Sequence, residues 1–463
     1  MYTNRWRILH IVNLGTFVST LDIGIVNVAL PTMAEQFSVS LAQIQWVVTC
    51  YLLTMVALLP LMGKLSDQVG RNKIYSGGFL VFGLGSLVAA LSGSLTWIII
   101  ARCIQGVGAT MIMANSQAMV RQIFPDNERG KALGLNAVII SVGTLAGPAV
   151  GGILMVYTGW EGLFLINVPL GILGLVAGLR MFPNIKQAAS KGLDVIGIVA
   201  LAAATVLLVL AAEGGVDVRQ VWLLTGSGVA LLAGLIYYET RISNGILDKE
   251  LFTNRTIAIG NTSAFFFHLV QMATLIPITF YLQYKLGYEP WLTGLMLSLQ
   301  PLFMGIVAPI SGWYRDRFGA FALLVAGPVI GAASLVVVVV LPIGSAVAIA
   351  VHLALFGAAM GFFQATNNAE IMSAAPEHKI SHTGSMLALI RYLGMIAGIG
   401  LAAAFVGNLG GADGPTPADS QLRYLFLLCF VFCLVILGAS MLRRPGKVSP
   451  VNSSKGSAAG RKG

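Results

Sequence analysis

Charged side chains are scarce in this sequence. Asp, Glu, Lys and Arg together make up 10% of its 463 residues, whereas about a quarter of a typical soluble domain is charged because its surface faces water. Hydrophobic residues make up 57% of the chain, and its 54 glycines would let helices approach closely inside a bilayer. The composition therefore excludes a soluble globule and predicts an integral membrane protein.

The sequence also lacks the motifs of common enzymes and metal sites. It contains no phosphate-binding loop, no His-Glu-x-x-His and no Cys-x-x-Cys. We therefore expect neither an enzyme nor a bound cofactor or metal. Four cysteines fall inside apolar runs, where they are expected to pack as small hydrophobic groups: Cys50, Cys103, Cys429 and Cys433.

The net charge of +10 does not predict a nucleic-acid-binding protein. A nucleic-acid-binding surface gathers its basic residues in one broad patch. Here Lys and Arg occur in short clusters between apolar runs and in the last residues of the chain. This distribution is typical of loops between membrane helices.

Fourteen apolar stretches are long enough to cross a bilayer as helices. A hydrocarbon core about 30 Å thick needs about 20 residues of helix. The first stretch is not followed by a small-residue cleavage site, so we expect it to remain as a helix. The predicted spans are 8–30, 44–63, 74–93, 97–120, 133–156, 161–182, 194–213, 220–240, 257–282, 291–312, 320–341, 346–372, 384–407 and 422–442.

The positive charges indicate the orientation of these helices, since cytoplasmic loops are enriched in Lys and Arg. With a cytoplasmic N-terminus, 23 of the 28 Lys and Arg residues fall on the inside and three on the outside. The other two, Arg102 and Arg391, lie within predicted spans. We therefore predict an even number of helices, with both termini in the cytoplasm.

Two loops repeat the pattern Gly-x-x-x-Asp-x-x-Gly. They occupy 63–70, after the second span, and 312–319, after the tenth, on the same predicted membrane face. Two copies at equivalent turns indicate duplicated halves, a common construction of secondary transporters. We predict an all-α protein with a six-helix N-terminal bundle, a two-helix insertion, a six-helix C-terminal bundle and a disordered basic tail near anionic lipid headgroups. Their boundaries are 1–182, 183–256, 257–442 and 443–463.

Several motifs together resemble the major facilitator superfamily and, within it, the fourteen-helix drug:proton antiporters of the EmrB/QacA type. The resemblance covers essentially residues 8–442. It is carried by the loop at 63–73 and by Leu-Asp-Ile-Gly-Ile-Val-Asn-Val-Ala-Leu-Pro at 21–31, Arg-Cys-Ile-Gln-Gly-Val-Gly at 102–108, Gly-Thr-Leu-Ala-Gly-Pro-Ala-Val-Gly-Gly at 143–152 and Asn-Val-Pro-Leu-Gly at 167–171.

The chain departs from that family's usual pattern at two places. Gly24 stands where the first-helix motif usually has Thr, and Trp160-Glu161-Gly162 stands where Trp-Arg-Trp is common. Both places lie near the outer half of the membrane. The departures could therefore bear on the range of substrates.

Asp22 and Arg102 are predicted to face each other in the N-terminal half. Both lie within spans and, at 1.5 Å per residue, reach a similar depth in the outer half of the membrane. A charge there costs at least about 2.5 kcal/mol, so it needs a partner or a function. Burial favours the neutral acid and a nearby arginine favours the carboxylate, which makes Asp22 a plausible proton carrier. The resemblance implies the same role, and a static structural pair is the alternative.

A second polar cluster is predicted near the inner end of the C-terminal half. It contains Glu370 and Arg391 with Asn367 and Asn368. An interfacial ion pair that fastens two helices or a gate explains these residues better than a direct role in proton or substrate binding. Both interpretations remain open.

The two repeated loops contain charges at the membrane surface, where an Asp can cap a helix or pair with an Arg of the other half. The resemblance implies that they hold and release the outward-facing state, and simple solvated charges are the alternative. The candidate gating residues are Gly63, Asp67, Gly70, Arg71, Asp316 and Gly319.

The fifth span contains small residues on one stretch. The spacing from Gly147 to Gly151 permits close helix contact, and Pro148 removes a backbone donor and bends the helix. Together with Gly143 and Gly152, they resemble the antiporter motif and favour exchange over uptake. We expect them to pack against the other half and to seal the transport path.

Other polar and apolar groups carry weaker signals. Five polar residues are interpreted as interhelical hydrogen-bonding groups rather than ligands: His268, Gln271, Gln300, His352 and Gln364. A greasy cavity for lipophilic cations is a further possibility, although packing explains its members more simply: Tyr51, Met55, Met111, Phe265, Phe266, Phe267 and Met272.

The leading hypothesis is a proton-coupled antiporter that exports amphipathic or cationic drugs by alternating access and so confers drug resistance. The rivals are an exporter of one endogenous metabolite, lipid or siderophore, and a solute uptake symporter. With no ATP-binding motif, the proton gradient is the expected energy source. We expect a monomer in a bacterial cytoplasmic membrane, with protons, lipids and a small molecule as its partners and no nucleic acid.

Overall fold

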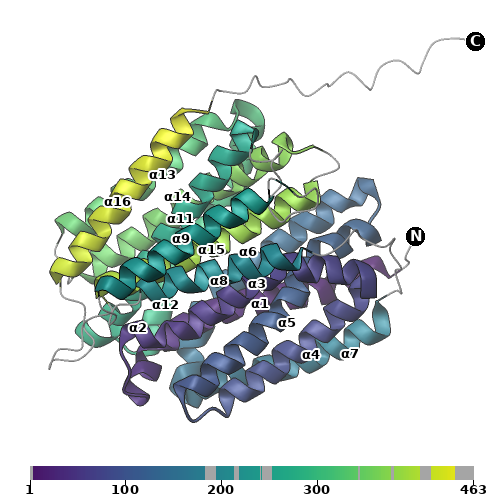
Figure 1. Cartoon of the computed structure of the whole chain (residues 1–463), viewed down its shortest axis with the longest axis horizontal. Coiled ribbons are helices and arrows are strands. Elements are labelled where there is room, and N and C mark those ends of the chain that lie inside the picture. The colour runs from purple at the N-terminus through teal and green to yellow at the C-terminus, as the bar shows by residue number, and fades with distance from the viewer. Residues whose placement is uncertain are drawn as a thin grey trace, which may run out of the picture.

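A computed structural model describes residues 4–182, 194–212, 218–239, 241, 253–341, 345–376, 380–406 and 419–443 (Figure 1). Its regular elements are all helical within these ranges. The helices are α1 (Arg5–Gln36), α2 (Leu41–Ile44), α3 (Trp46–Val69), α4 (Arg71–Ala90), α5 (Leu95–Ile123), α6 (Asp126–Leu165), α7 (Asn167–Met181), α8 (Val195–Ala212), α9 (Val218–Glu239), α11 (Arg255–Phe280) with a π-helical end (Tyr281–Lys285), α12 (Pro290–Phe318), α13 (Phe321–Val340), α14 (Ala346–Ala374), α15 (Ile380–Val406) and α16 (Asp419–Met441).

Twelve helical stretches in the described part of the chain are long and apolar enough to cross a membrane. One of them, 131–181, has 51 residues and contains most of α6 and all of α7, with non-helical backbone at Gly159. Residues 196–208 of α8 form a shorter apolar helix that is not counted among the twelve. The predicted number of fourteen differs from twelve at these two places.

The helices pack as two sets built in the same way. In the first set, α1 packs on α6, α3 on α5, and α4 on both α5 and α7. In the second set, α11 packs on α15, α12 on α14, and α13 on both α14 and α16. Since the four pairings recur in the same chain order, the structure shows the duplication that the repeated loops predicted.

The two repeated loops also have the same backbone feature. Gly70 ends α3 with a φ of 112°, and Gly319 ends α12 with a φ of 89°. Side chains disfavour this region, and glycine enters it readily because it has no Cβ. The second glycine of each copy is therefore required by the turn between two helices.

Helices α8 and α9 pack on each other between the two sets (Figure 1). Helix α8 contacts α3 of the first set and α15 of the second. The segments 183–193 and 242–252, which hold the ends of the predicted insertion, lie outside the described residues.

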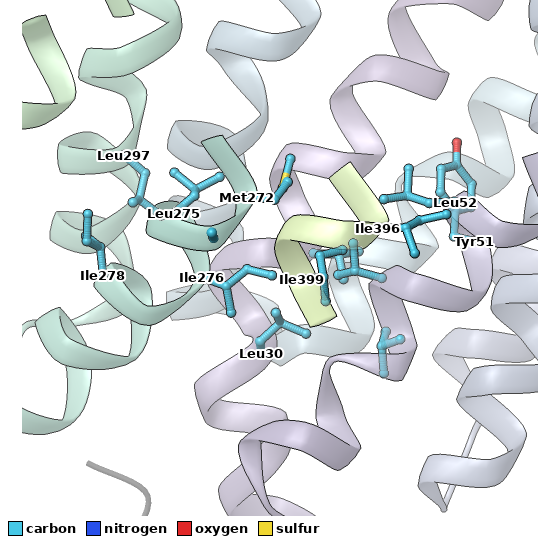
Figure 2. Close-up of a cluster of buried hydrophobic side chains, with 14 of the residues drawn as sticks. Leu30, Tyr51, Leu52, Met272, Leu275, Ile276, Ile278, Leu297, Ile396 and Ile399 are labelled. Atoms are coloured by element: carbon cyan, nitrogen blue, oxygen red, sulfur yellow. The ribbon is translucent and has the colours of Figure 1, made fainter. Parts of the chain in front are cut away.

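The contact between the two sets is largely apolar. Figure 2 shows Leu30 of α1, Tyr51 of α3, Met272 of α11, Leu297 of α12 and Ile396 of α15 among the side chains of this cluster. All five are nearly fully buried. These labelled side chains therefore form an apolar contact between helices of the two sets.

Candidate functional site

Asp22 and Arg102 form a buried ion pair inside the first set. One guanidinium nitrogen, Nη1, donates to Asp22 Oδ2 at 2.5 Å. The side chains of Asp22 and Arg102 are 1% and 0% exposed, respectively. The predicted pairing of these two residues is therefore present in the structure.

Polar groups from neighbouring helices complete the surroundings of the pair. Asn167, the first residue of α7, donates to Asp22 Oδ1 at 3.1 Å. Gln105, one turn after Arg102, accepts from Nη1 at 2.8 Å and donates to Ser86 of α4 at 2.6 Å. Four helices of the first set thus converge on one carboxylate and its partners.

The guanidinium of Arg102 is held on two further sides. Its Nε donates to the carbonyl of Val47 at 2.9 Å, and its Cζ lies 4.2 Å from the ring centroid of Tyr51. Its Nη2 nevertheless has no hydrogen-bond partner. One donor of this buried guanidinium is therefore unused among the described residues.

A cavity of about 180 Å³ lies between the two sets of helices. Its wall is formed by α1, α5 and α6 of the first set and by α11, α12, α14 and α15 of the second. Thr20, Ile23, Gly24 and Asn27 of α1 line it, whereas Asp22 does not. The carboxylate points away from the cavity, so one helix carries the cavity wall on one side and the buried acid on the other.

Four of the five isolated polar residues line this cavity together. Gln364 approaches His268, with Nε2 of each side chain 3.5 Å apart. Gln271 and Gln300 lie in the same wall, and Oε1 of Gln271 is buried without a hydrogen-bond partner. The interpretation of each as a separate interhelical link missed this arrangement, although the spacing of residues 268 and 271 on one helix face indicates a shared direction.

The fifth residue, His352, does not line the cavity. It packs against Phe356 and Phe426, with ring centroids 5.8 and 6.0 Å away. The predicted greasy lining is also mostly absent from the cavity wall. Of those seven residues only Met272 lies there, while Tyr51, Met55 and Phe267 belong to the buried core.

The structure divides the predicted second polar cluster. Asn367 donates to the carbonyl of Gly260 at 3.0 Å and accepts from Arg443 at 2.7 Å. Arg391 lines the central cavity instead, and no ion pair joins it to Glu370 among the described residues. The sequence gives the depth of a residue in the membrane but not the rotation of its helix, and for this reason the predicted partner was wrong.

Arg443 takes the place that was expected for Arg391. It is 8% exposed, although the sequence assigns it to the tail. Burial lowers the pKa of Arg443 to about 10, against the opposite effect of nearby Glu370. The rest of the predicted tail, 444–463, lies outside the described residues.

The charges of the repeated loops pair locally. Asp67 bonds to Arg71 at 2.7 Å, and Asp316 bonds to its neighbour Arg315 at 2.7 Å. Neither of these ion pairs joins the two sets of helices. These two contacts therefore do not provide the expected pairing across the halves.

The small residues of the fifth predicted span pack in two directions. An added Cβ on Gly147 would meet Cα of Gly24 at 2.8 Å, and one on Gly151 would meet Cα of Ile25 at 3.0 Å. These contacts, like that of Gly143, are with α1 of the same set. The expected packing against the other half holds for Gly152 and Pro148, which meet α12 around Trp291 and Gly294.

The two departures from the family pattern differ in position. Gly24 lines the cavity and also faces Pro148, whose Cδ an added Cβ would meet at 2.9 Å. Trp160 packs on Phe37 and donates to Gln36 at 2.7 Å, whereas Glu161 and Gly162 do not line the cavity. Only Gly24 can therefore contact a molecule in the cavity.

Two hydrogen bonds join the two sets where α1 ends, and a third joins Ser298 of α12 to the carbonyl of Leu145 of α6 at 3.4 Å. Gln283 donates to the carbonyl of Val28 at 2.9 Å, and Tyr284 donates to that of Pro31 at 2.6 Å. Where α1 begins, the ion pair of Arg5 with Glu128 stays within the first set. The described contacts thus close the bundle at the end of α1 that contains Gln36.

A duplicated helical bundle with a central cavity and a buried acid beside it is the architecture of a membrane transporter. Residues 12–399 match the Major Facilitator Superfamily, and the chain belongs to this superfamily. It is therefore a multi-pass membrane transporter and not an enzyme. In the described part of the chain, no group of three or more His, Cys, Asp or Glu side chains could hold a metal ion.

Named relatives and a solved structure agree with this assignment. The chain is 35% identical over 403 residues to the riboflavin transporter RibZ of Clostridioides difficile (strain 630), which covers 87% of this chain and 88% of the relative. It is 31% identical over 415 residues to MdtD of Escherichia coli O6:K15:H31 (strain 536 / UPEC), a protein named for multidrug resistance, with 88% and 87% covered. A POT family transporter crystallised with 5-aminolevulinic acid shares the fold, with a TM-score of 0.71, 15% identity and coverage of 94% and 96%.

Proposed function

We propose that this protein is a proton-coupled antiporter that exports amphipathic organic compounds by alternating access. The observation that carries the proposal is the ion pair of Asp22 and Arg102, buried beside the central cavity but outside its wall. A buried pair is costly to maintain, and a charge inside a membrane span is a mark of function. The relative named for multidrug resistance supports export of this kind.

In this mechanism Asp22 carries the proton. Protonation removes its negative charge and frees Arg102, while Gln105 and Asn167 can bond to either form of the acid. The Arg102 side chain then moves toward other acceptors, and α1 shifts against α6 along their glycine contacts. The cavity on the other face of α1 changes shape in response, so proton binding alters affinity for the cargo.

The proposal includes a topology of fourteen spans arranged as six, two and six. Division of the 51-residue stretch into α6 and α7, together with α8, would supply the two spans beyond twelve. With both termini in the cytoplasm of a bacterial cell, the Gln283 and Tyr284 hydrogen bonds lie on the outer side. The conformation is then closed to the outside.

A second candidate is a carrier dedicated to one metabolite. The four polar residues His268, Gln271, Gln300 and Gln364 in the cavity wall favour it, because hydrogen-bonding groups discriminate among polar molecules. The relative named as a riboflavin transporter gives this candidate a test compound. The resemblance of residues 143–152 to the antiporter motif favours exchange over uptake for either candidate.

The test is transport in proteoliposomes under an imposed pH gradient with three fluorescent probes. Fluorescein is anionic, riboflavin is uncharged and rhodamine 123 is cationic at neutral pH. We expect the gradient to drive at least one probe uphill, and we expect Asp22→Asn to abolish this movement. The control Asp419→Asn removes an exposed carboxylate paired with Lys285 and should retain transport.

The result separates the two candidates. Movement of several unrelated probes supports a polyspecific exporter, and movement of riboflavin alone supports a dedicated carrier. Gradient-driven transport that is unchanged in the Asp22→Asn variant would overturn the proposed coupling role.

A further inference from the structure

The wall of the central cavity carries formal charge of one sign only. Its wall consists of 21 described residues, and none of them is Asp or Glu. The wall contains one formal charge, the guanidinium of Arg391. A lipophilic cation would therefore meet a positive field there and no carboxylate to bind it.

The two arginines within predicted spans differ in the hydrogen-bond and ion-pair partners of their guanidinium groups. Arg102 has the carboxylate of Asp22, the carbonyl of Val47 and the amide of Gln105 as partners. No described carboxylate lies within ion-pair distance of Arg391, which remains partly exposed to the cavity. A cation left unpaired at this depth is costly and marks a binding position for an anion.

Neutral hydrogen-bonding groups surround this cation. His268 and Gln364 lie in the same wall as Arg391, with Nε2 of each of the two side chains 3.5 Å apart. Two acceptors that line the cavity, Oε1 of Gln271 and Oδ1 of Asn27, are buried without hydrogen-bond partners. A ligand with both a negative group and a donor would satisfy groups that the protein leaves unused.

The apolar part of the wall is rich in methionine. Methionine sulfur atoms contact aromatic rings favourably and adapt to their shape. Tyr392 adds one aromatic ring beside Arg391. The methionines of the cavity wall are Met113, Met272, Met304, Met360 and Met395.

We propose that the cavity binds aromatic organic anions, with Arg391 as the ligand of the acidic group and the methionines against the ring. This inference rests on the proposed transport function only in taking the cavity as the cargo site. It replaces the lipophilic cation that the sequence predicts with a cargo of opposite charge.

The experiment measures equilibrium binding to the purified full-length protein in nanodiscs, with fluorescence polarisation as the readout. Fluorescein and rhodamine 123 share a xanthene ring system and differ in charge, so they form a matched pair. We expect fluorescein to bind at least about tenfold more tightly than rhodamine 123. We expect Arg391→Gln to weaken fluorescein binding by about tenfold or more, because a charge-assisted contact is lost.

Three further variants make the result specific. Arg391→Lys keeps the charge and should restore most of the affinity. Gln364→Glu adds a carboxylate to the wall and should shift the preference toward rhodamine 123. The control Arg423→Gln removes one positive charge from an exposed position of α16 and should change neither affinity.

Rhodamine 123 binding as tight as fluorescein binding, or unchanged fluorescein binding in a folded Arg391→Gln variant, would overturn the inference. If Arg391→Gln does not fold, the Gln364→Glu variant decides instead. The inference would also be overturned if Gln364→Glu bound each dye as tightly as the unmodified protein does. Anion binding without gradient-driven transport would overturn the antiporter proposal and leave this inference standing. Gradient-driven transport of rhodamine 123 alone would overturn this inference and leave the antiporter proposal standing.

Discussion

The ring of Tyr51 lies beneath the guanidinium of Arg102, with the ring centroid 4.2 Å from Cζ. Tyr51 and Tyr392 of α15 both belong to the buried cluster between the two sets. Tyr392 lines the central cavity next to Arg391. Tyr51 therefore lies against the buried ion pair and in the same cluster as a residue of the cavity wall.

This position predicts an effect of Tyr51→Leu on coupling. Loss of the cation–π contact, worth about 0.5–2 kcal/mol, would loosen the guanidinium and leave a gap in the cluster that contains Tyr392. We expect weaker pH-driven transport with nearly unchanged equilibrium binding of the same probe, both measured on one preparation. Tyr51→Phe keeps the ring and should retain transport, and an equal loss in Tyr51→Phe would assign the effect to the hydroxyl instead.

The ion pair of Asp22 and Arg102 predicts strong non-additivity in stability. Arg102→Met leaves a buried carboxylate without its cation, and this should destabilise the protein by about 3–5 kcal/mol. The double variant Asp22→Asn/Arg102→Met has no buried charge and should recover most of that loss. Thermal unfolding in detergent micelles measures the three variants, and additive effects of the two single changes would contradict the prediction.

The sequence could predict this pair because depth in the membrane follows from position within a span. It could not predict the cavity wall, since that depends on which face of each helix points inward. Lipid-facing and core-facing positions are both apolar in a membrane helix, so the pattern of hydrophobic residues carries little rotational information. Arg391 shows the consequence: its depth was compatible with Glu370, but the rotation of α15 turns it toward the cavity.

The repeated loops were more predictable than the cavity. Their motif contains a glycine that the backbone requires, and a required glycine leaves a signal in the sequence that does not depend on distant packing. By contrast, Gly24 could be recognised only as a departure from a family pattern. Its structural reason, contact with Gly147 and Pro148, needs the placement of α6 against α1.

That contact predicts the response to Gly24→Ala. The added Cβ would lie 2.9 Å from Cδ of Pro148 and 3.0 Å from Cα of Gly147, and backbone there cannot move aside cheaply. We expect a loss of about 1–3 kcal/mol in the free energy of unfolding, as for other overpacked positions. The control Gly305→Ala lies in open space on α12 and should be neutral or slightly stabilising, and equal responses of the two variants would argue against this packing.

The repeated motif predicts a matched pattern of tolerance in both halves. The first glycine of each copy, Gly63 or Gly312, has nothing within 4 Å of an added Cβ, whereas Gly70 and Gly319 have positive φ angles. Ala at Gly70 or Gly319 should therefore cost about 1–3 kcal/mol of backbone strain, while Ala at Gly63 or Gly312 should cost little. Unfolding midpoints of the four single variants measure this directly.

The comparison across copies is the sharper part of that experiment. If the two loops are equivalent turns of a duplicated fold, the losses of stability at Gly70 and Gly319 should agree, because both glycines end a helix with a positive φ. A large loss of stability in Gly70→Ala with none in Gly319→Ala would mean that the turn after α12 can relax. The structural equivalence of the two halves would then not extend to the rigidity of their loops.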